Sequence, residues 1–244
     1  MVCPLKTTLE KILLLAPRAY ARLLKLKSNW SLDKYLFLSL ARRGDVILDG
    51  GANVGIYSLL FSRLVGSKGK VYAFEPAPPT FAQLEKTLLE NRTKNITAYS
   101  FALGNEPGQA TIHLPNGVSG HAALKPHAEA WGDVSVKPFE VEVRRLDDWV
   151  EEINLQRVDF IKLDLEGAEP LAIEGASKTL RRYMPSIHLE LSPGFMKDFG
   201  RSVEDLLNLL QKIGYDALLS FRDKENPPAF LSDLLRQKSN GLDC

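Results

Sequence analysis

Short apolar runs alternate with amphipathic stretches from residue 45 onward. A run of consecutive apolar residues between turn-forming residues is typical of a buried strand, whereas apolar residues spaced three or four apart are typical of a helix. Their alternation favours βαβ units, and therefore an α/β fold with a mostly parallel sheet and helices on both faces. The predicted strands are 46–48, 71–74, 96–101, 158–163, 186–191 and 217–221, and the predicted helices are 54–65, 80–91, 168–182 and 203–213.

Two regions depart from this alternation. Residues 104–145 contain two stretches of alternating polar and apolar residues, and we expect a β-hairpin insertion with a long loop there. Residues 1–44 have apolar residues at helical spacing, with Pro17 ending or kinking the first helix. We therefore divide the chain into an N-terminal helical cap, 1–44, and one α/β domain, 45–244.

The composition is that of an ordinary globular protein, with 244 residues of which 45% are hydrophobic and 25% charged. The formal net charge of +1 gives no support for nucleic-acid binding. The charge is uneven, however, because residues 1–45 hold nine Lys and Arg against three Asp and Glu. We favour a cap packed on the domain, and the alternative is a basic surface for a membrane or an acidic partner.

Cysteine usage and hydropathy point to a cytoplasmic protein. Cys3 and Cys244 lie far apart in the sequence, which is neither a disulfide framework nor a zinc pattern and fits a reducing compartment. The apolar run at 12–15 is far shorter than a membrane span, and the residues around it lack the order of a signal peptide.

The first predicted strand leads into the sequence D-G-G-A-N-V-G at 49–55 and then into a helix. Glycines permit a tight turn and a close approach of a ligand to the backbone, and the helix N-terminus offers free N–H groups. The second strand ends at Glu75, whose carboxylate is suited to both ribose hydroxyls of an adenosine, with Phe74 and Pro76 shaping its surroundings. These features predict a nucleotide-like cofactor.

The glycine spacing discriminates among such cofactors. Nicotinamide-dependent enzymes favour G-x-G-x-x-G, whereas this chain has D-x-G-x-x-x-G, headed by Asp49. S-adenosyl-L-methionine has no pyrophosphate, and Asp49 would favour its ammonium group directly or through water. An NAD(P)-dependent oxidoreductase and a purely structural βα turn remain the alternatives at this point.

A second motif, I-K-L-D-L-E-G-A-E at 161–169, completes a resemblance to the FkbM family of methyltransferases. The matching blocks also include D-G-G-A-N-V-G at 49–55, V-Y-A-F-E-P at 71–76 and F-A-L-G at 101–104, in the family's order and spacing. The resemblance covers residues 45–195 and leaves out the N-terminal segment and the C-terminal tail.

The resemblance implies a Rossmann-like class I methyltransferase fold with a mostly parallel seven-stranded sheet. It also implies S-adenosyl-L-methionine as methyl donor, and O-methylation of a hydroxyl on a sugar or another small-molecule natural product. The sequence lacks the Asp that many methyltransferases place beside the adenine, so a backbone contact is expected there. The cofactor positions carried over are Asp49, Gly51, Asn53, Gly55, Glu75, Pro76, Ala102 and Leu103.

Asp164, at the end of the fourth strand, is the first candidate for catalysis. Three roles are open to it: accepting the proton of the acceptor hydroxyl, holding the cofactor's cationic end, or ligating a divalent metal. Glu166 is a second candidate, whereas Glu169 falls in a first helical turn, where an acid is favourable for structural reasons. His121, in the insertion, is chemically suited to act as a base near neutral pH, although loop histidines are usually solvated.

Four other residues are weaker candidates. His188 and Glu190 share one face of the fifth strand, and we expect a core histidine and an acid that serves either the site or the structure. His113 and His127 flank His121 at spacings that match no common ligand pattern, so no metal site is expected.

Three functions follow from these observations. The leading one is a methyltransferase acting on a small-molecule hydroxyl. An NAD(P)-dependent oxidoreductase is disfavoured by the missing glycine pattern, and a non-catalytic module that keeps the fold is disfavoured by the intact glycines, Glu75 and Asp164. The sequence has no basic and aromatic stripe, so no nucleic-acid partner is expected, and the oligomeric state stays open.

Overall fold

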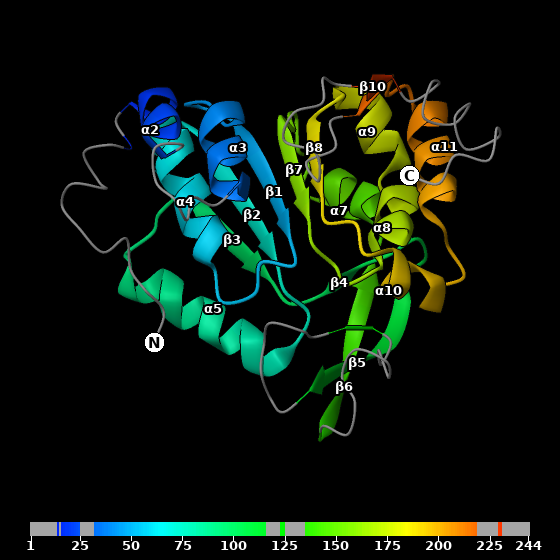
Figure 1. The fold of residues 1–244 in the computed structure, drawn as a ribbon. Coiled ribbons are helices and arrows are strands. Elements are labelled where there is room, and N and C mark those ends of the chain that lie inside the picture. Colours follow the sequence, from blue (N-terminus) through cyan, green and yellow to red (C-terminus); the bar gives the residue numbers. More distant parts are fainter. Residues whose placement is uncertain are drawn as a thin grey trace.

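A five-stranded parallel sheet forms the centre of the computed structural model, which describes residues 14, 16–24, 32–115, 123–124, 135–218 and 229–230. The strands are β1 (Val46–Gly50), β2 (Lys70–Phe74), β3 (Ile96–Tyr99), β7 (Phe160–Leu163) and β8 (Ser186–Leu189). They lie in the order β3-β2-β1-β7-β8 (Figure 1). The strand order therefore reverses between β1 and β7.

The expected α/β Rossmann-like sheet is confirmed, but the count of seven strands is wrong for the described residues. The other strands are β4 (Ala102–Leu103), β5 (Gly108–Pro115), β6 (Val136–Arg144), β9 (Ala217–Leu218) and β10 (Ala229–Phe230). The first three form a separate mixed sheet in the order β4-β6-β5, and β9 pairs with β10. The predicted strand 96–101 breaks after Tyr99 because the chain from Ala102 onward pairs with β6 instead.

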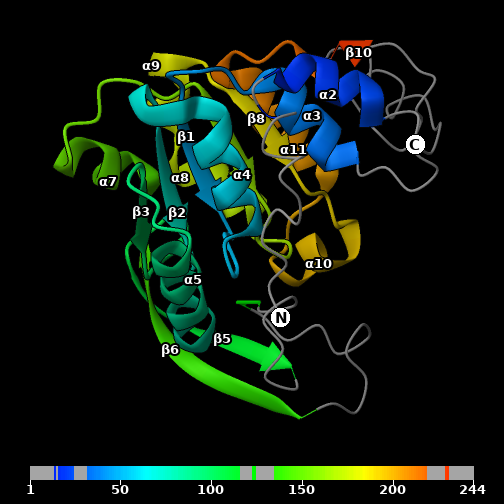
Figure 2. The same ribbon diagram turned by 90° about the vertical axis from the view of Figure 1, so that its left-hand side faces the viewer.

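Helices cover both faces of the parallel sheet (Figures 1 and 2). One face carries α2 (Pro17–Leu24), α3 (Leu32–Leu40), α4 (Ile56–Val65) and α5 (Pro78–Glu90). The other carries α7 (Leu146–Glu152), α8 (Glu169–Gly175), α9 (Ser177–Tyr183) and α11 (Val203–Ile213). A short 3-10 turn, η1 (Gly66–Lys68), follows α4, and α10 (Pro193–Asp198) follows β8.

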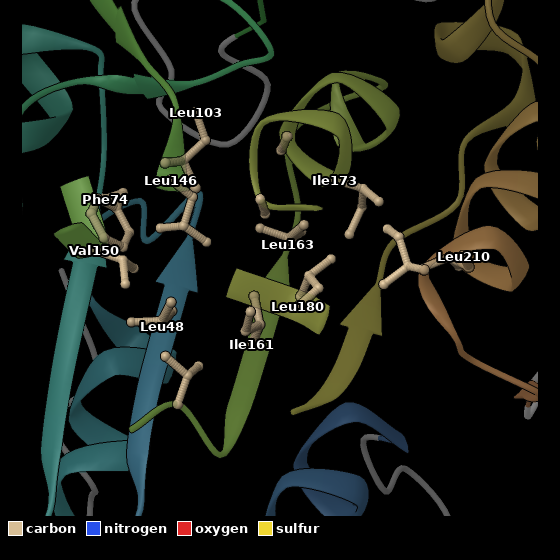
Figure 3. Packing of buried hydrophobic residues seen from close by; sticks show 14 of the residues in the cluster. Leu48, Phe74, Leu103, Leu146, Val150, Ile161, Leu163, Ile173, Leu180 and Leu210 are labelled. Carbon is tan, nitrogen blue, oxygen red and sulfur yellow. The ribbon is translucent and has the colours of Figure 1, made fainter. Parts of the chain in front are cut away.

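Side chains of alternate residues in the central strands point to opposite faces of the sheet and form two apolar layers, one under each set of helices. Ile47 and Phe160 pack under α3 and α4, where Phe37 contacts the Phe160 ring. Leu48 and Ile161 point to the opposite face and join the larger apolar cluster. Figure 3 shows that cluster, with Leu48, Ile161 and Leu163 facing Ile173, Leu180 and Leu210.

The predicted helices differ in how well they match. The helix 203–213 is confirmed at its predicted bounds. Its start is defined by a reciprocal capping box between Ser202 and Asp205. The helix 168–182 is wrong as a single helix, since the structure has α8 and α9 with a break after Gly175. The short helices α7 and α10, with 7 and 6 residues, show too little periodicity to be predicted.

The β-hairpin insertion is confirmed, since β5 pairs with β6 along its whole length and the hairpin extends away from the parallel sheet (Figures 1 and 2). In the N-terminal region, α2 begins at Pro17, and Phe37 of α3 belongs to the core cluster under α4. The helix predicted before Pro17 lies outside the described residues. Within the described part of the chain, no helix is long and apolar enough to cross a membrane.

Replacing Gly175 with alanine tests the close contact between α8 and the end of β4. The added Cβ would lie 1.9 Å from the carbonyl oxygen of Gly104, so the backbone must shift. We expect the free energy of unfolding to fall by about 1–3 kcal/mol. Urea denaturation measures the change, with Gly108→Ala as the control because a Cβ at Gly108 meets nothing within 4 Å. Equal stability of the two variants would contradict the contact.

Candidate functional site

The carboxyl ends of β1 and β7 meet where the strand order reverses, which is the place where open α/β sheets bind ligands. An open pocket lies there, whose empty space, counted out into the solvent, is about 620 Å³. It is lined by Gly51, Asn53, Phe74, Glu75, Pro76, Phe101, Ala102, Leu103, Ile112, Leu124, Asp164, Leu165, Glu166 and Ala168.

The turn after β1 reaches the pocket through residues in the left-handed conformation. Gly51, Asn53 and Gly55 have φ angles of 69°, 50° and 89°, which explains the glycines at 51 and 55. A Cβ on Gly51 would lie 1.9 Å from the carbonyl oxygen of Asp164, so the turn directly contacts the end of β7. Gly55 instead allows α4 to begin close to Leu84 of α5, and it does not line the pocket.

Glu75, directly after β2, is held by two backbone N–H groups. Its Oε2 accepts a hydrogen bond from the Asn53 N–H and its Oε1 from the Ala77 N–H, each at 3.0 Å. Burial, opposed by these hydrogen bonds, raises the pKa of Glu75 to about 7. Because each carboxylate oxygen can accept more than one hydrogen bond, Glu75 still offers acceptors to a ribose diol in the pocket.

An apolar wall contributed by β4 and the hairpin insertion completes this part of the pocket. Ile112 and Leu124 belong to it and are missing from the sequence-based site. The alternating pattern at 109–114 was the available signal for Ile112. Leu124 is brought in by the bridge between His113 and Ala123, a contact that no local pattern reveals. The wall offers an apolar surface of the kind that an adenine ring requires.

A second part of the pocket is acidic. Asp164 and Glu166 line it, and Glu190, which follows β8, is hydrogen-bonded to Asp164. That hydrogen bond, together with partial burial of the carboxyl group, raises the pKa of Glu190 to about 8. Burial, with the charge of Asp164 nearby, raises the pKa of Glu166 to about 7. Carboxyl groups that titrate near neutral pH are suited to accepting and passing on a proton.

Glu169 supports the loop that carries these acids. Its side chain is fully buried, and its Oε1 accepts a hydrogen bond from the Leu165 N–H at 2.6 Å. Burial raises the pKa of Glu169 to about 7, against the effect of that hydrogen bond. Glu169 does not line the pocket, so we assign it a structural role.

Lys162 is a residue of the site that the sequence analysis misses. Its ammonium lies 3.4 Å from Asp49 Oδ1 and 3.4 Å from Asp164 Oδ2, and it donates to the carbonyl oxygens of Gly50 and Gly51. Burial alone would lower the pKa of Lys162, but Asp49 and Asp164 raise it. A cation inside an apolar strand was the available signal, because a buried charge requires partners.

Asp49 lies beneath the turn. It is fully buried, accepts a hydrogen bond from Ser58 Oγ at 2.5 Å and pairs with Lys162. It does not line the pocket. The structure therefore shows Asp49 in contact with Ser58 and Lys162, and not on the surface of the pocket where the ligand ammonium considered above would meet it directly.

Eight of the predicted site residues line one pocket, namely Gly51, Asn53, Glu75, Pro76, Ala102, Leu103, Asp164 and Glu166. His121 and His127 lie outside the described residues. His188 faces α3, with its Nε2 3.5 Å from the Asp33 carboxylate, and His113 lies on the hairpin. Among the residues that the structure describes, no group of three or more His, Cys, Asp or Glu is arranged to hold a metal ion.

The chemistry of the pocket fits S-adenosylmethionine. Glu75 suits the ribose hydroxyls, the apolar wall suits adenine, and the acidic part suits the cationic sulfur and ammonium groups. A dinucleotide would place its pyrophosphate at the glycine turn, where the described residues of the pocket offer the acidic side chains Asp164 and Glu166 and no cationic side chain.

Curated relatives each match more than half of the chain. The match to 2-O-methyltransferase NoeI of Sinorhizobium fredii has 29% identity over 165 residues. It covers 64% of this chain and 67% of that protein. The chain is 29% identical to Methyltransferase 1 of Beauveria bassiana, with 53% and 57% covered. It is 25% identical to Hexuronic acid methyltransferase AglP of Haloferax volcanii, with 60% and 56% covered. The match thus spans little more than half the length of two of these relatives.

Among solved structures, the methyltransferase FkbM from Methylobacillus flagellatus matches with a TM-score of 0.46 and 19% identity, covering 83% of this chain and 52% of that chain. The family model described as the Methyltransferase FkbM domain matches residues 49–217. This range includes every residue that lines the pocket. The chain therefore belongs to the FkbM family of methyltransferases.

Proposed function

We propose that this chain is an S-adenosylmethionine-dependent methyltransferase that methylates a hydroxyl of a sugar or another small molecule. The observation that carries the proposal is that Glu75, the glycine turn and Asp164 line the same pocket. Membership of the family supports methyl transfer. The acceptor class is supported by relatives named as a 2-O-methyltransferase, a hexuronic acid methyltransferase and a 31-O-demethyl-FK506 methyltransferase. Scarce cysteine supports a cytoplasmic location.

In this proposal the residues of the chain bind, orient and take up a proton. Glu75 accepts hydrogen bonds from the ribose hydroxyls, while the apolar wall with Ile112 and Leu124 contacts the adenine. When bound, S-adenosylmethionine supplies an electrophilic methyl group on a cationic sulfur. Asp164 accepts the proton of the acceptor hydroxyl, and the exposed Glu190, hydrogen-bonded to Asp164, passes a proton to solvent.

Isothermal titration with S-adenosylmethionine and S-adenosylhomocysteine tests the cofactor part of the proposal. We expect binding of both in the micromolar range, and no binding of NAD or NADP. Absence of binding of either adenosyl compound at high micromolar concentration would overturn the proposal. Release of S-adenosylhomocysteine in the presence of a panel of methyl glycosides, hexuronates and hydroxylated macrolides then identifies the acceptor class.

The variant Glu75→Gln should bind S-adenosylhomocysteine about 10- to 100-fold more weakly. The reason is that the charged acceptor of two ribose hydroxyls becomes an amide with a single acceptor oxygen, and hydrogen bonds to charged groups contribute about 1.5–3 kcal/mol. Isothermal titration measures the loss. Glu85→Gln, on the exposed side of α5, is the matched control and should bind as the wild type does. Unchanged affinity in Glu75→Gln would remove Glu75 from the site.

The affinity for S-adenosylhomocysteine should rise with pH up to neutrality. The pKa of Glu75 is about 7, and its carboxyl group offers full acceptor capacity only after losing the proton. Below pH 7, binding must remove that proton, so Kd should increase up to about tenfold per pH unit. The slope should persist in Glu190→Gln, whose carboxyl titrates in the same range, and flatten in Glu75→Gln. A constant Kd between pH 6 and 8 contradicts this assignment.

The variant Asp164→Asn should separate turnover from binding. Loss of the proton acceptor should lower kcat by about 10²–10⁴-fold, while affinity for S-adenosylhomocysteine changes far less, because Asn keeps the size of the side chain. Asp216→Asn, at an exposed position far along the chain, is the control. Wild-type turnover in Asp164→Asn would assign proton acceptance to another group.

A further inference from the structure

Lys162 occupies an unusual position, in the middle of a central strand and only 2% exposed. The strand register places Lys162 opposite Asp49 on β1 and opposite His188 on β8. The three side chains therefore form one row on the sheet face that α3 and α4 cover, while Ile161 and Leu163 point to the apolar core.

The polar groups that this ammonium contacts all lie at the carboxyl ends of β1 and β7. It donates to the carbonyl oxygen of Gly51 at 2.9 Å and to that of Gly50 at 3.3 Å. It also lies 3.4 Å from Asp49 Oδ1 and 3.4 Å from Asp164 Oδ2. One buried cation thus joins the turn that borders the cofactor pocket to the acid at the end of β7.

The side of the ammonium toward α4 is covered by an aromatic ring. The Tyr57 ring centre lies 5.7 Å from Lys162 Nζ, and the Tyr57 hydroxyl donates to Asp33 at 3.3 Å. Asp33 in turn lies 3.5 Å from His188 Nε2. The ammonium is therefore enclosed between the sheet, α4 and the first turn of α3, which restricts the positions open to it.

The contribution of Lys162 to stability does not explain its presence. Removing a charged group from water costs free energy, and an apolar side chain of similar volume in such a row is often as stable or more stable. Lys162 contacts both the glycine turn and Asp164, so a role in the site accounts for its presence better than stability does.

We propose that Lys162 is a positioning residue of the methyl-transfer site, whose ammonium holds the glycine turn and the Asp164 carboxylate in a fixed relation. This inference rests on the proposed function, since the turn and Asp164 are taken to serve the cofactor and the acceptor. Two peptide groups of the turn, Gly50–Gly51 and Gly51–Ala52, are held at both ends. Their N–H groups donate to the Phe74 carbonyl oxygen, and their carbonyl oxygens accept from Lys162.

The variant Lys162→Met keeps the length of the side chain and removes the cation. We expect the affinity for S-adenosylhomocysteine, measured by isothermal titration of the folded protein, to fall about 10- to 100-fold. The amide ¹⁵N resonances of Gly51 and Ala52 should also shift, because their peptide carbonyls lose a hydrogen-bond donor. A purely structural role would lower the stability of the variant but leave the affinity of the folded protein for S-adenosylhomocysteine unchanged.

Two controls separate positioning from loss of stability. Lys70→Met removes a lysine from β2, which β1 separates from β7, and the Lys70 ammonium lies over the Tyr72 ring at 5.9 Å. Ile161→Val loosens the apolar face of the same strand. Both should bind S-adenosylhomocysteine as the wild type does, with unshifted Gly51 and Ala52 signals.

A charge-balanced background covers the case in which Lys162→Met does not fold. In Asp49→Asn, one buried carboxylate is already neutral, so adding Lys162→Met leaves Asp164 as the remaining charge of the three. The double variant should bind S-adenosylhomocysteine at least tenfold more weakly than Asp49→Asn alone. Equal affinities would overturn the positioning role while the proposed function stands. If the wild type itself bound no S-adenosylhomocysteine, the proposed function would fail first.

Discussion

The contact between the turn after β1 and the end of β7 determines the geometry of the whole site. Gly50 lies opposite Leu163 in the parallel register, and the Asp164 N–H donates to the Gly50 carbonyl oxygen at 3.3 Å. At Gly51 the two segments come so close that no side chain fits between them. The backbone that borders the cofactor pocket and the carboxylate of Asp164 are therefore set by the sheet itself, which is more rigid than a loop.

The same alternation lets one strand serve both the core and the site. Ile161 and Leu163 enter the large apolar cluster (Figure 3). Lys162, between them in the strand, faces the opposite side and pairs with Asp49. The apolar side chains Ile161 and Leu163 stabilise the fold by burial alone, because they need no hydrogen-bond partners. The second face carries a buried ion pair, whose cost is tolerable because the neighbouring strands and the turn supply carboxylate and carbonyl acceptors for the ammonium.

Local patterns are enough to predict the strands of the parallel sheet, the glycine turn and Glu75, since each depends on neighbours along the chain. The features that the sequence analysis misses depend on distant contacts. The break after Gly175 lies where this residue approaches Gly104, and Leu124 reaches the pocket next to the pairing of His113 with Ala123. Lys162 was visible as a charge in an apolar run, but only the strand register shows which acids surround it.

The acidic part of the pocket carries less charge than its composition suggests. Glu166 and Glu190 have pKa values raised to about 7 and about 8, so at neutral pH both are substantially protonated. Asp164 faces the Lys162 ammonium, which offsets its charge. A hydroxyl-bearing acceptor therefore does not meet three full negative charges. Because protonated carboxyl groups also donate hydrogen bonds, this end of the pocket is suited to orienting a polyhydroxylated acceptor as well as to receiving its proton.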